Sequence, residues 1–165
     1  MPSILLAVLV GTCAYAQTNH ASQPREQAEF GAEDEHWQLP VRVPEAVLQI
    51  LRSVNNALPD EMPEKSLLGS EIHLDGPEET DLIVMGVKSL RLPHGALFWV
   101  FRKNRDRYEL ILSTGGDALT VLDAKWKGHR EIRVYNNTAR TTTATFYKFD
   151  GEHYREFEAK TSPIR

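Results

Sequence analysis

From Ser70 onward the chain consists of short runs of β-branched and aromatic residues separated by Gly, Asp, Asn and Pro. Runs of this kind, bounded by turn-forming residues, are typical of β-strands. The connections between them are about four to eight residues long, too short for the crossover that parallel strands require. The sequence therefore predicts an antiparallel meander of about seven to eight strands, built as a sandwich or as a curved single sheet. The expected strands are residues 70–74, 81–87, 96–101, 108–113, 119–123, 131–135, 143–149 and 154–158.

One segment before these strands has helical periodicity. Pro44 lies near the first helical position, Glu45 lies in the first turn, and Pro59 ends the segment. Apolar residues recur between them at helical spacing, which predicts one amphipathic helix packed on the sheet. These residues are Val47, Leu48, Leu51, Val54 and Leu58. The fold class is therefore α+β and dominated by β-structure.

The first sixteen residues have the pattern of a signal peptide. They carry no charge, run apolar from Ile4 to Val10, and end in Ala14-Tyr15-Ala16, the small-x-small pattern of a cleavage site. The apolar run is shorter than the ~20 residues that span a bilayer. We therefore expect cleavage after Ala16 and export to the periplasm or the cell exterior, with no transmembrane segment in the mature chain. A buried N-terminal strand is the structural alternative.

The only cysteine, Cys13, would leave with this signal peptide. The mature chain would then have no disulfide, no thiolate nucleophile and no cysteine metal site. Thr12 immediately before Cys13 fits a lipoprotein signal poorly, so we do not expect a lipid anchor at this cysteine.

Charge is concentrated in the segment that follows. Residues 17–36 hold one Arg against five carboxylates, a net of 1 − 5 = −4, which equals the net charge of the whole chain. The segment therefore predicts an acidic disordered tether or a partner-binding acidic tail, followed by one β-rich domain over residues 37–160. Because the rest of the chain is neutral, it has no global field to attract nucleic acid.

Two parts of the meander echo one another. Asp81–Val84, Phe98–Phe101 and Tyr108 are followed by a second series of similar runs. These are Glu131–Val134, Phe146–Phe149 and Tyr154. The echo indicates either an internal duplication or a chance likeness between two aromatic hairpins.

The segment Leu74–Val84, an acidic Asp-Gly loop that runs into an Asp-apolar-apolar-Val strand, resembles FG-GAP or VCBS-type repeats. Phe149–Tyr154 resembles the Phe-Asp-Gly-x-x-Tyr hairpin of such extracellular repeats. The resemblance implies an exported β module that serves as an adhesion or binding scaffold. The loop of that family often holds calcium, and the carboxylates of this chain could supply its oxygen ligands. The candidate ligands are Asp75, Glu78, Glu79 and Asp81, although Pro77 breaks the usual spacing and a solvated acidic turn is the alternative.

The sequence contains no catalytic motif that we recognise. Its six histidines are scattered without a His-Glu-x-x-His pattern, and no serine lies in Gly-x-Ser-x-Gly. Two classes of function remain: a non-enzymatic exported binding or interaction module, and a small secreted hydrolase assembled from dispersed residues. Asp81, His94 and His129 are available for the second. No cofactor other than calcium is indicated.

Topology indicates one candidate ligand-binding surface. In a meander every second connection lies at the same end, so loops 102–107 and 125–130 should be neighbours. Their basic residues would surround Trp126, whose ring could stack on an anionic glycan, a lipid head group or an envelope protein. These basic residues include Arg102, Lys103, Arg105, Lys125 and Lys127. The acidic turns 75–81 and 150–152 belong to the same end, so mutual neutralisation of surface charge is the alternative.

Overall fold

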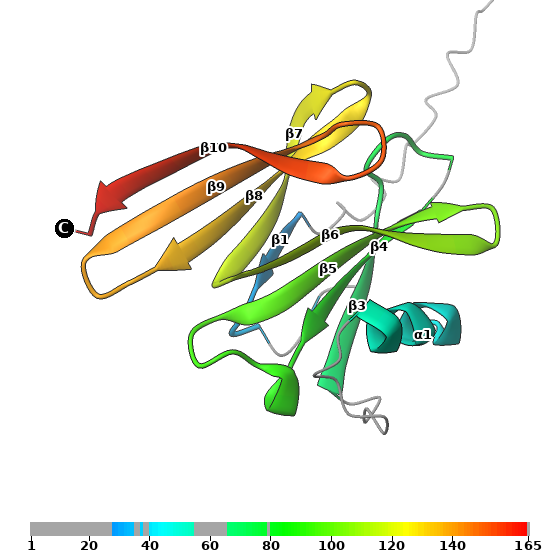
Figure 1. Ribbon diagram of the computed structural model, residues 1–165, viewed down its shortest axis with the longest axis horizontal. Coiled ribbons are helices and arrows are strands. Elements are labelled where there is room, and N and C mark those ends of the chain that lie inside the picture. The colour runs from blue at the N-terminus through cyan, green and yellow to red at the C-terminus, as the bar shows by residue number, and fades with distance from the viewer. Residues whose placement is uncertain (1–27, 35–36, 38–39, 55–65, 79, 165) are drawn as a thin grey trace, which may run out of the picture.

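The computed structural model describes residues 28–34, 37, 40–54, 66–78 and 80–164. Within them the chain is dominated by strands, which form two antiparallel five-stranded sheets packed as a sandwich (Figure 1). The β-dominated antiparallel class predicted from the sequence is confirmed. The expected signal peptide with Cys13, Leu58 of the expected helix, and Glu79 lie outside the described residues.

The two sheets are named here by their strands. Sheet A has the order β1 (Glu29–Gly31), β7 (Ala118–Trp126), β8 (His129–Asn137), β9 (Thr141–Phe149) and β10 (Tyr154–Pro163). Sheet B has the order β2 (Pro40–Val41), β3 (Leu67–Ile72), β4 (Asp81–Gly86), β5 (Ala96–Asn104) and β6 (Arg107–Gly116). A short 3₁₀-helix, η2 (Lys88–Leu90), lies between β4 and β5. The two halves of the sequence echo occupy different sheets, since one forms β4–β6 and the other β8–β10.

The helix α1 (Glu45–Val54) forms a third layer on sheet B. Its buried residues Val47, Leu48 and Leu51 belong to one apolar cluster with Trp99 and Phe101 of β5. A second cluster fills the space between the sheets. β4 therefore lies between two cores and is buried at every position, which accounts for its continuous apolar run.

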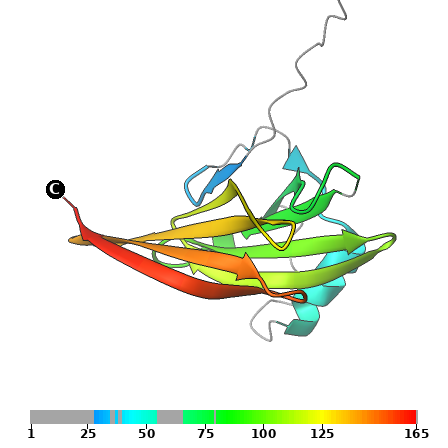
Figure 2. The ribbon, with the colours of Figure 1, turned by 90° about the horizontal axis from the view of Figure 1, so that it is seen from above.

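The outer face of sheet A has a different environment. The helix covers sheet B, and no helix of the described residues covers sheet A (Figure 1). β1 and β10 lie at the two edges of this sheet, which Figure 2 shows on opposite sides of the molecule. This outer face is the main sheet surface left to solvent among the described residues.

β1 lies within the segment that the sequence indicated as a tether. Residues 29–31 pair with β7, and Phe30 is fully buried. Its ring meets that of Trp37 edge-on, with 4.8 Å between centroids. A strand thus forms before residue 37, held by its pairing with β7 and by the buried Phe30 side chain.

Candidate functional site

Four connections meet at one end of the sandwich. Asp81, at the end of the β3–β4 loop, accepts a hydrogen bond from the backbone N–H of Lys103 on β5 at 3.0 Å. The N–H of Arg130 on β8 donates to the carbonyl of Leu74 at 2.7 Å. Lys127 Nζ, in the β7–β8 turn, donates to the Asp150 carbonyl of the β9–β10 turn at 3.2 Å. The acidic turns and the basic loops thus share one end, as the alternation of connections requires.

Asp81 is the buried centre of this end, with only 1% of its surface exposed. One carboxylate oxygen accepts from Lys103, and the other accepts from the N–H of Leu74 at 3.2 Å. Burial raises the pKa of the Asp81 carboxyl to about 6, and these two hydrogen bonds act in the opposite direction. The side chain therefore fixes the β3–β4 loop to β5.

Tyr154 and Arg130 complete the buried end. Tyr154 Oη donates to the carbonyl of Arg130 at 2.6 Å, and burial, followed by the nearby charge of Asp81, raises the pKa of the tyrosine. The guanidinium of Arg130 donates to the carbonyls of Leu122 and Val121. These hydrogen bonds join β7, β8 and β10, so the arrangement holds this end of the sandwich together.

The predicted basic cluster is only partly available. Arg102 pairs with Glu109 on β6 and stands over the Phe149 ring, 5.3 Å from its centroid. Lys127 is bonded to the β9–β10 turn. Arg105, which has φ of 56°, and Lys125 are exposed. Lys103 contributes its backbone N–H to Asp81.

The residues offered for a hydrolase do not all meet. His129 lies at the same end as Asp81, stacked on Phe149 with 4.0 Å between centroids, and its Nε2 is 3.7 Å from Asp75. His94 precedes β5, whose Lys103 donates to Asp81. The strand from Ala96 to Lys103 alone spans ~23 Å at ~3.3 Å per residue, so His94 lies at the other end of the strand. The structure therefore places two of the three candidates at the same end of the sandwich.

The four carboxylates predicted as calcium ligands lie in or beside the β3–β4 loop, and Glu79 is outside the described residues. Each oxygen of Asp81 accepts one backbone N–H, which leaves further lone pairs on the carboxylate. Asp75 lies beside His129, and Glu78 is exposed. Among the residues that the structure describes, no three His, Cys, Asp or Glu side chains gather as a metal site.

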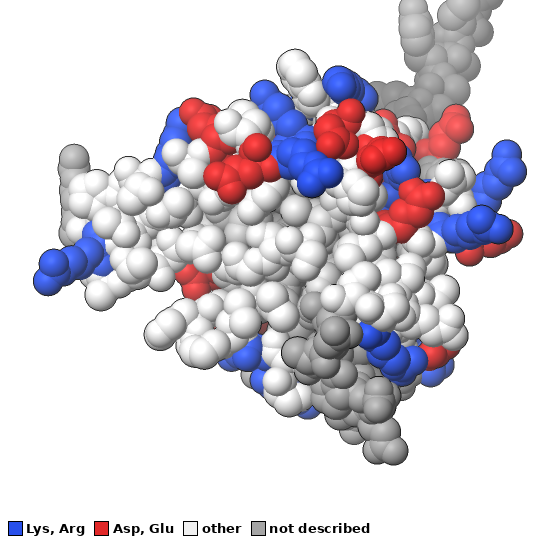
Figure 3. Space-filling view, in the orientation of Figure 1, with Lys and Arg blue, Asp and Glu red and all other residues white. Residues whose placement is uncertain are grey.

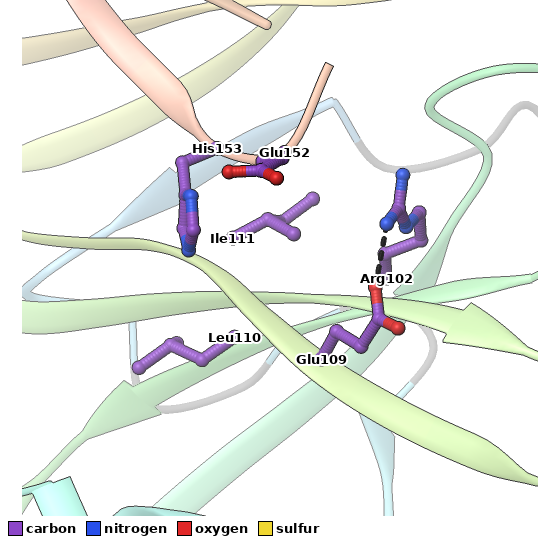
Figure 4. Close-up of a pocket in the computed structure, with 6 residues that line it drawn as sticks. All are labelled: Arg102, Glu109, Leu110, Ile111, Glu152 and His153. Atoms are coloured by element: carbon purple, nitrogen blue, oxygen red, sulfur yellow. Dashed lines mark hydrogen bonds and ion pairs between the residues drawn. The ribbon is translucent and has the colours of Figure 1, made fainter. Parts of the chain in front are cut away.

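A pocket of about 430 Å³ lies between sheet B and the β9–β10 turn (Figure 4). Glu152 and His153 of the turn face it from one side, and Arg102 and Glu109 face it from the other. Leu110 and Ile111 of β6 complete the lining. The Arg102–Glu109 ion pair occupies two of its charged groups, and the lining has no Ser, Thr, Cys or Lys nucleophile.

The outer face of sheet A carries a group of aromatic rings and ammonium groups, which we call the aromatic–lysine face. Its members come from three strands and are Trp126, Phe146, Lys148, Phe157 and Lys160. Lys148 Nζ lies 4.8 Å from the Trp126 ring centroid and 3.8 Å from that of Phe157. The rings of Phe146 and Phe157 are 6.2 Å apart, and Lys160 Nζ is 5.2 Å from the Phe146 ring. Rings and ammonium groups therefore alternate across the sheet.

Two rings of this face remain open to solvent. Trp126 is 47% exposed and Phe157 is 43% exposed. Glu131 lies 3.4 Å from Lys148 and offsets part of its charge, whereas Lys160 pairs with Glu158 at 3.0 Å. Figure 3 shows charged side chains gathered along the upper edge of the molecule, above a largely uncharged central region. In the same orientation, sheet A forms the upper part of the ribbon in Figure 1.

Sequence reasoning found Trp126 but missed the other four members. Lys148 and Phe146 alternate with buried positions on β9, a signal that was present in the pattern. Phe157 lies on the outer face by alternation from the buried Tyr154, and Lys160 joins it there because β10 has a bulge between Glu156 and Glu158. Side-chain alternation in the sequence does not reveal a bulge.

Comparison of the chain with known protein families, with characterised proteins and with solved structures finds no match. The resemblance to FG-GAP or VCBS-type repeats therefore stays a prediction. Within the described residues, no helix has the length and apolar character needed to cross a membrane.

Proposed function

We propose that the protein is an exported, non-enzymatic binding module whose ligand docks on the aromatic–lysine face. The observation that carries this proposal is the exposure of Trp126 and Phe157, whose rings both lie near the Lys148 ammonium, on a sheet face that no helix of the described residues covers. Large aromatic side chains left in water at fixed positions are typical of recognition surfaces.

The alternation of rings and ammonium groups favours an anionic glycan as the ligand. Sugar rings present apolar C–H faces that stack on aromatic side chains, and their carboxylate or sulfate groups pair with lysine. Lys148 and Lys160 lie on successive strands of one rigid sheet, so the spacing of the charges is set before binding. Rigid placement lowers the entropy that binding costs.

The experiment compares affinity for a polyuronate and for neutral dextran of matched length. We expect the wild-type protein to bind the polyuronate more tightly, with affinity falling as salt rises, because exposed charges are screened over ~8 Å at physiological ionic strength. Trp126→Ala should weaken binding at least about tenfold, the effect of losing ~1.4 kcal/mol. Lys160→Gln should weaken binding and reduce the salt dependence.

Matched controls separate binding from folding. Val54→Ala removes an equally exposed apolar side chain from α1, and Arg140→Gln removes a charge from the β8–β9 turn; both should bind as the wild type does. Trp126→Ala should leave the melting temperature unchanged, whereas Trp99→Ala, which removes a fully buried ring, should cost ~3–5 kcal/mol. A large loss of stability in Trp126→Ala, or equal affinity for dextran and polyuronate, would contradict the proposal.

The hydrolase remains the second candidate, because the pocket beside β6 is lined by Glu109, Glu152 and His153. None of the residues first considered for catalysis lines this pocket. Polyuronate that is cleaved by the wild type and left intact by a Glu152→Gln variant would favour the hydrolase over the binding module.

A further inference from the structure

β10 offers an open edge for pairing with another strand. It is the last strand of sheet A, and its outer side pairs with no strand of the residues that the structure describes. From Glu158 to Pro163 it runs in unbroken register with β9, and Ala159 to Pro163 are all exposed. Figures 1 and 2 show the β9–β10 ribbon extending beyond the rest of the molecule. An edge of this kind presents unpaired backbone donors and acceptors.

The charges on this edge are self-complementary. Glu158 and Lys160 are two residues apart, so they project from the same face of the strand, where their side chains lie 3.0 Å apart. When two copies of β10 pair antiparallel about a two-fold axis at Ala159, Glu158 of each copy lies opposite Lys160 of the other. Directly opposite charges of unlike sign stabilise a strand pair.

Glu158 and Lys160 also disfavour pairings of the two β10 strands that are shifted by one residue. A shift of the axis to Glu158 places the two copies of this glutamate opposite one another, and a shift to Lys160 does the same with the two lysines. Like charges directly opposite are destabilising. An axis placed between two residues would set outward-facing residues of one copy opposite inward-facing residues of the other, which would turn one sheet over relative to its partner. The bulge at Phe157 limits the regular pairing to Glu158, Ala159 and Lys160, and Pro163, which lacks an N–H, falls outside it.

We propose that a second copy of this chain pairs along β10, with Ala159 on the two-fold axis, to form one continuous sheet across two molecules. In this arrangement the two aromatic–lysine faces point to the same side. If the proposed function holds, the joined faces would engage two stretches of one polymeric anionic glycan, which raises the effective affinity without new contacts. The pairing itself does not depend on the ligand.

The test is sedimentation equilibrium of the full chain in the absence of glycan. We expect a monomer–dimer equilibrium in the wild type. Glu158→Lys alone and Lys160→Glu alone should each raise the dimer dissociation constant at least about tenfold, because each creates two like-charge contacts per dimer. The double variant Glu158→Lys/Lys160→Glu should restore dimerisation, because both cross-strand pairs are re-formed with reversed sign.

Other outcomes overturn the inference. A wild-type chain that stays monomeric at the highest concentration reached would do so, as would a dimer insensitive to the single reversals or a double variant that fails to recover. Trp126→Ala should dimerise as the wild type does even if it loses glycan binding, so failure of the proposed function is distinguishable. The melting temperatures of the three charge variants, compared with that of the wild type, show whether a change in dimerisation comes from a folding defect.

Discussion

At the scale of single residues, Asp81 shows how a position that looks functional in the sequence serves the fold. It was a candidate calcium ligand and a candidate catalytic group, yet its two oxygens accept backbone N–H groups from different elements. A buried carboxylate with two donors is held ionised at some energetic expense, because burial raises its pKa. The sequence shows an aspartate at this position, but it does not show the two N–H groups that donate to the carboxylate, which belong to Leu74 and Lys103, 7 and 22 positions away.

This carboxylate predicts a pH-dependent term in stability. The pKa of Asp81 is about 6 in the folded state against 3.8 for an unperturbed aspartate, so the folded state holds its proton more tightly. The contribution of Asp81 to stability is therefore most favourable below about pH 4 and falls by about 3 kcal/mol as pH rises through about 6. Denaturant unfolding of the wild type and of Asp81→Asn from pH 4 to pH 7 measures it.

Comparing the two proteins removes the titration of all other groups from the result. The free energy of unfolding of the wild type, relative to Asp81→Asn, should decrease as pH rises across this range. A difference that stays constant with pH would show that Asp81 titrates alike in the folded and unfolded chains.

At the scale of elements, the sequence predicted strands well where they border a core and poorly where they border solvent. β4 matches the expected range to within one residue because its apolar run is buried, and β5 begins where expected but continues three residues further, to Asn104. β10 extends to Pro163, beyond the expected end at residue 158, because its last residues belong to an edge ribbon that covers no core. β1 was missed because its pairing partner lies about ninety residues away in β7, and local composition favours disorder there.

The passage from sheet B to sheet A depends on Gly116. A Cβ at this position would lie 2.5 Å from Val134 Cγ1 and 2.6 Å from the Tyr135 carbonyl oxygen. Gly116→Ala should therefore lower the free energy of unfolding by ~1–3 kcal/mol or more, since a backbone atom cannot easily move aside. Gly76→Ala is the matched control, because its Cβ would meet nothing within 4 Å. Equal stability of the two variants in urea would contradict this account of the sheet switch.

At the scale of the whole molecule, layering decides which surface is left for recognition. The helix covers sheet B and sheet A covers its other side, so the outer face of sheet A is left with exposed aromatic side chains. The sequence indicated a β domain with a helix on one face, but not which of two sheets the helix would cover. The candidate site could be predicted only as far as Trp126, because the rest of the face is assembled from cross-strand register.

The most direct test of this account is chemical-shift mapping of the isotopically labelled protein during titration with an acidic oligosaccharide. The account predicts the largest shifts at the Trp126 indole and at Lys148 and Phe157, on the outer face of sheet A. It also predicts small shifts at Glu109 and His153 in the pocket beside β6. Shifts concentrated in that pocket, with the Trp126 indole unchanged, would contradict the assignment of the aromatic–lysine face as the ligand-binding surface.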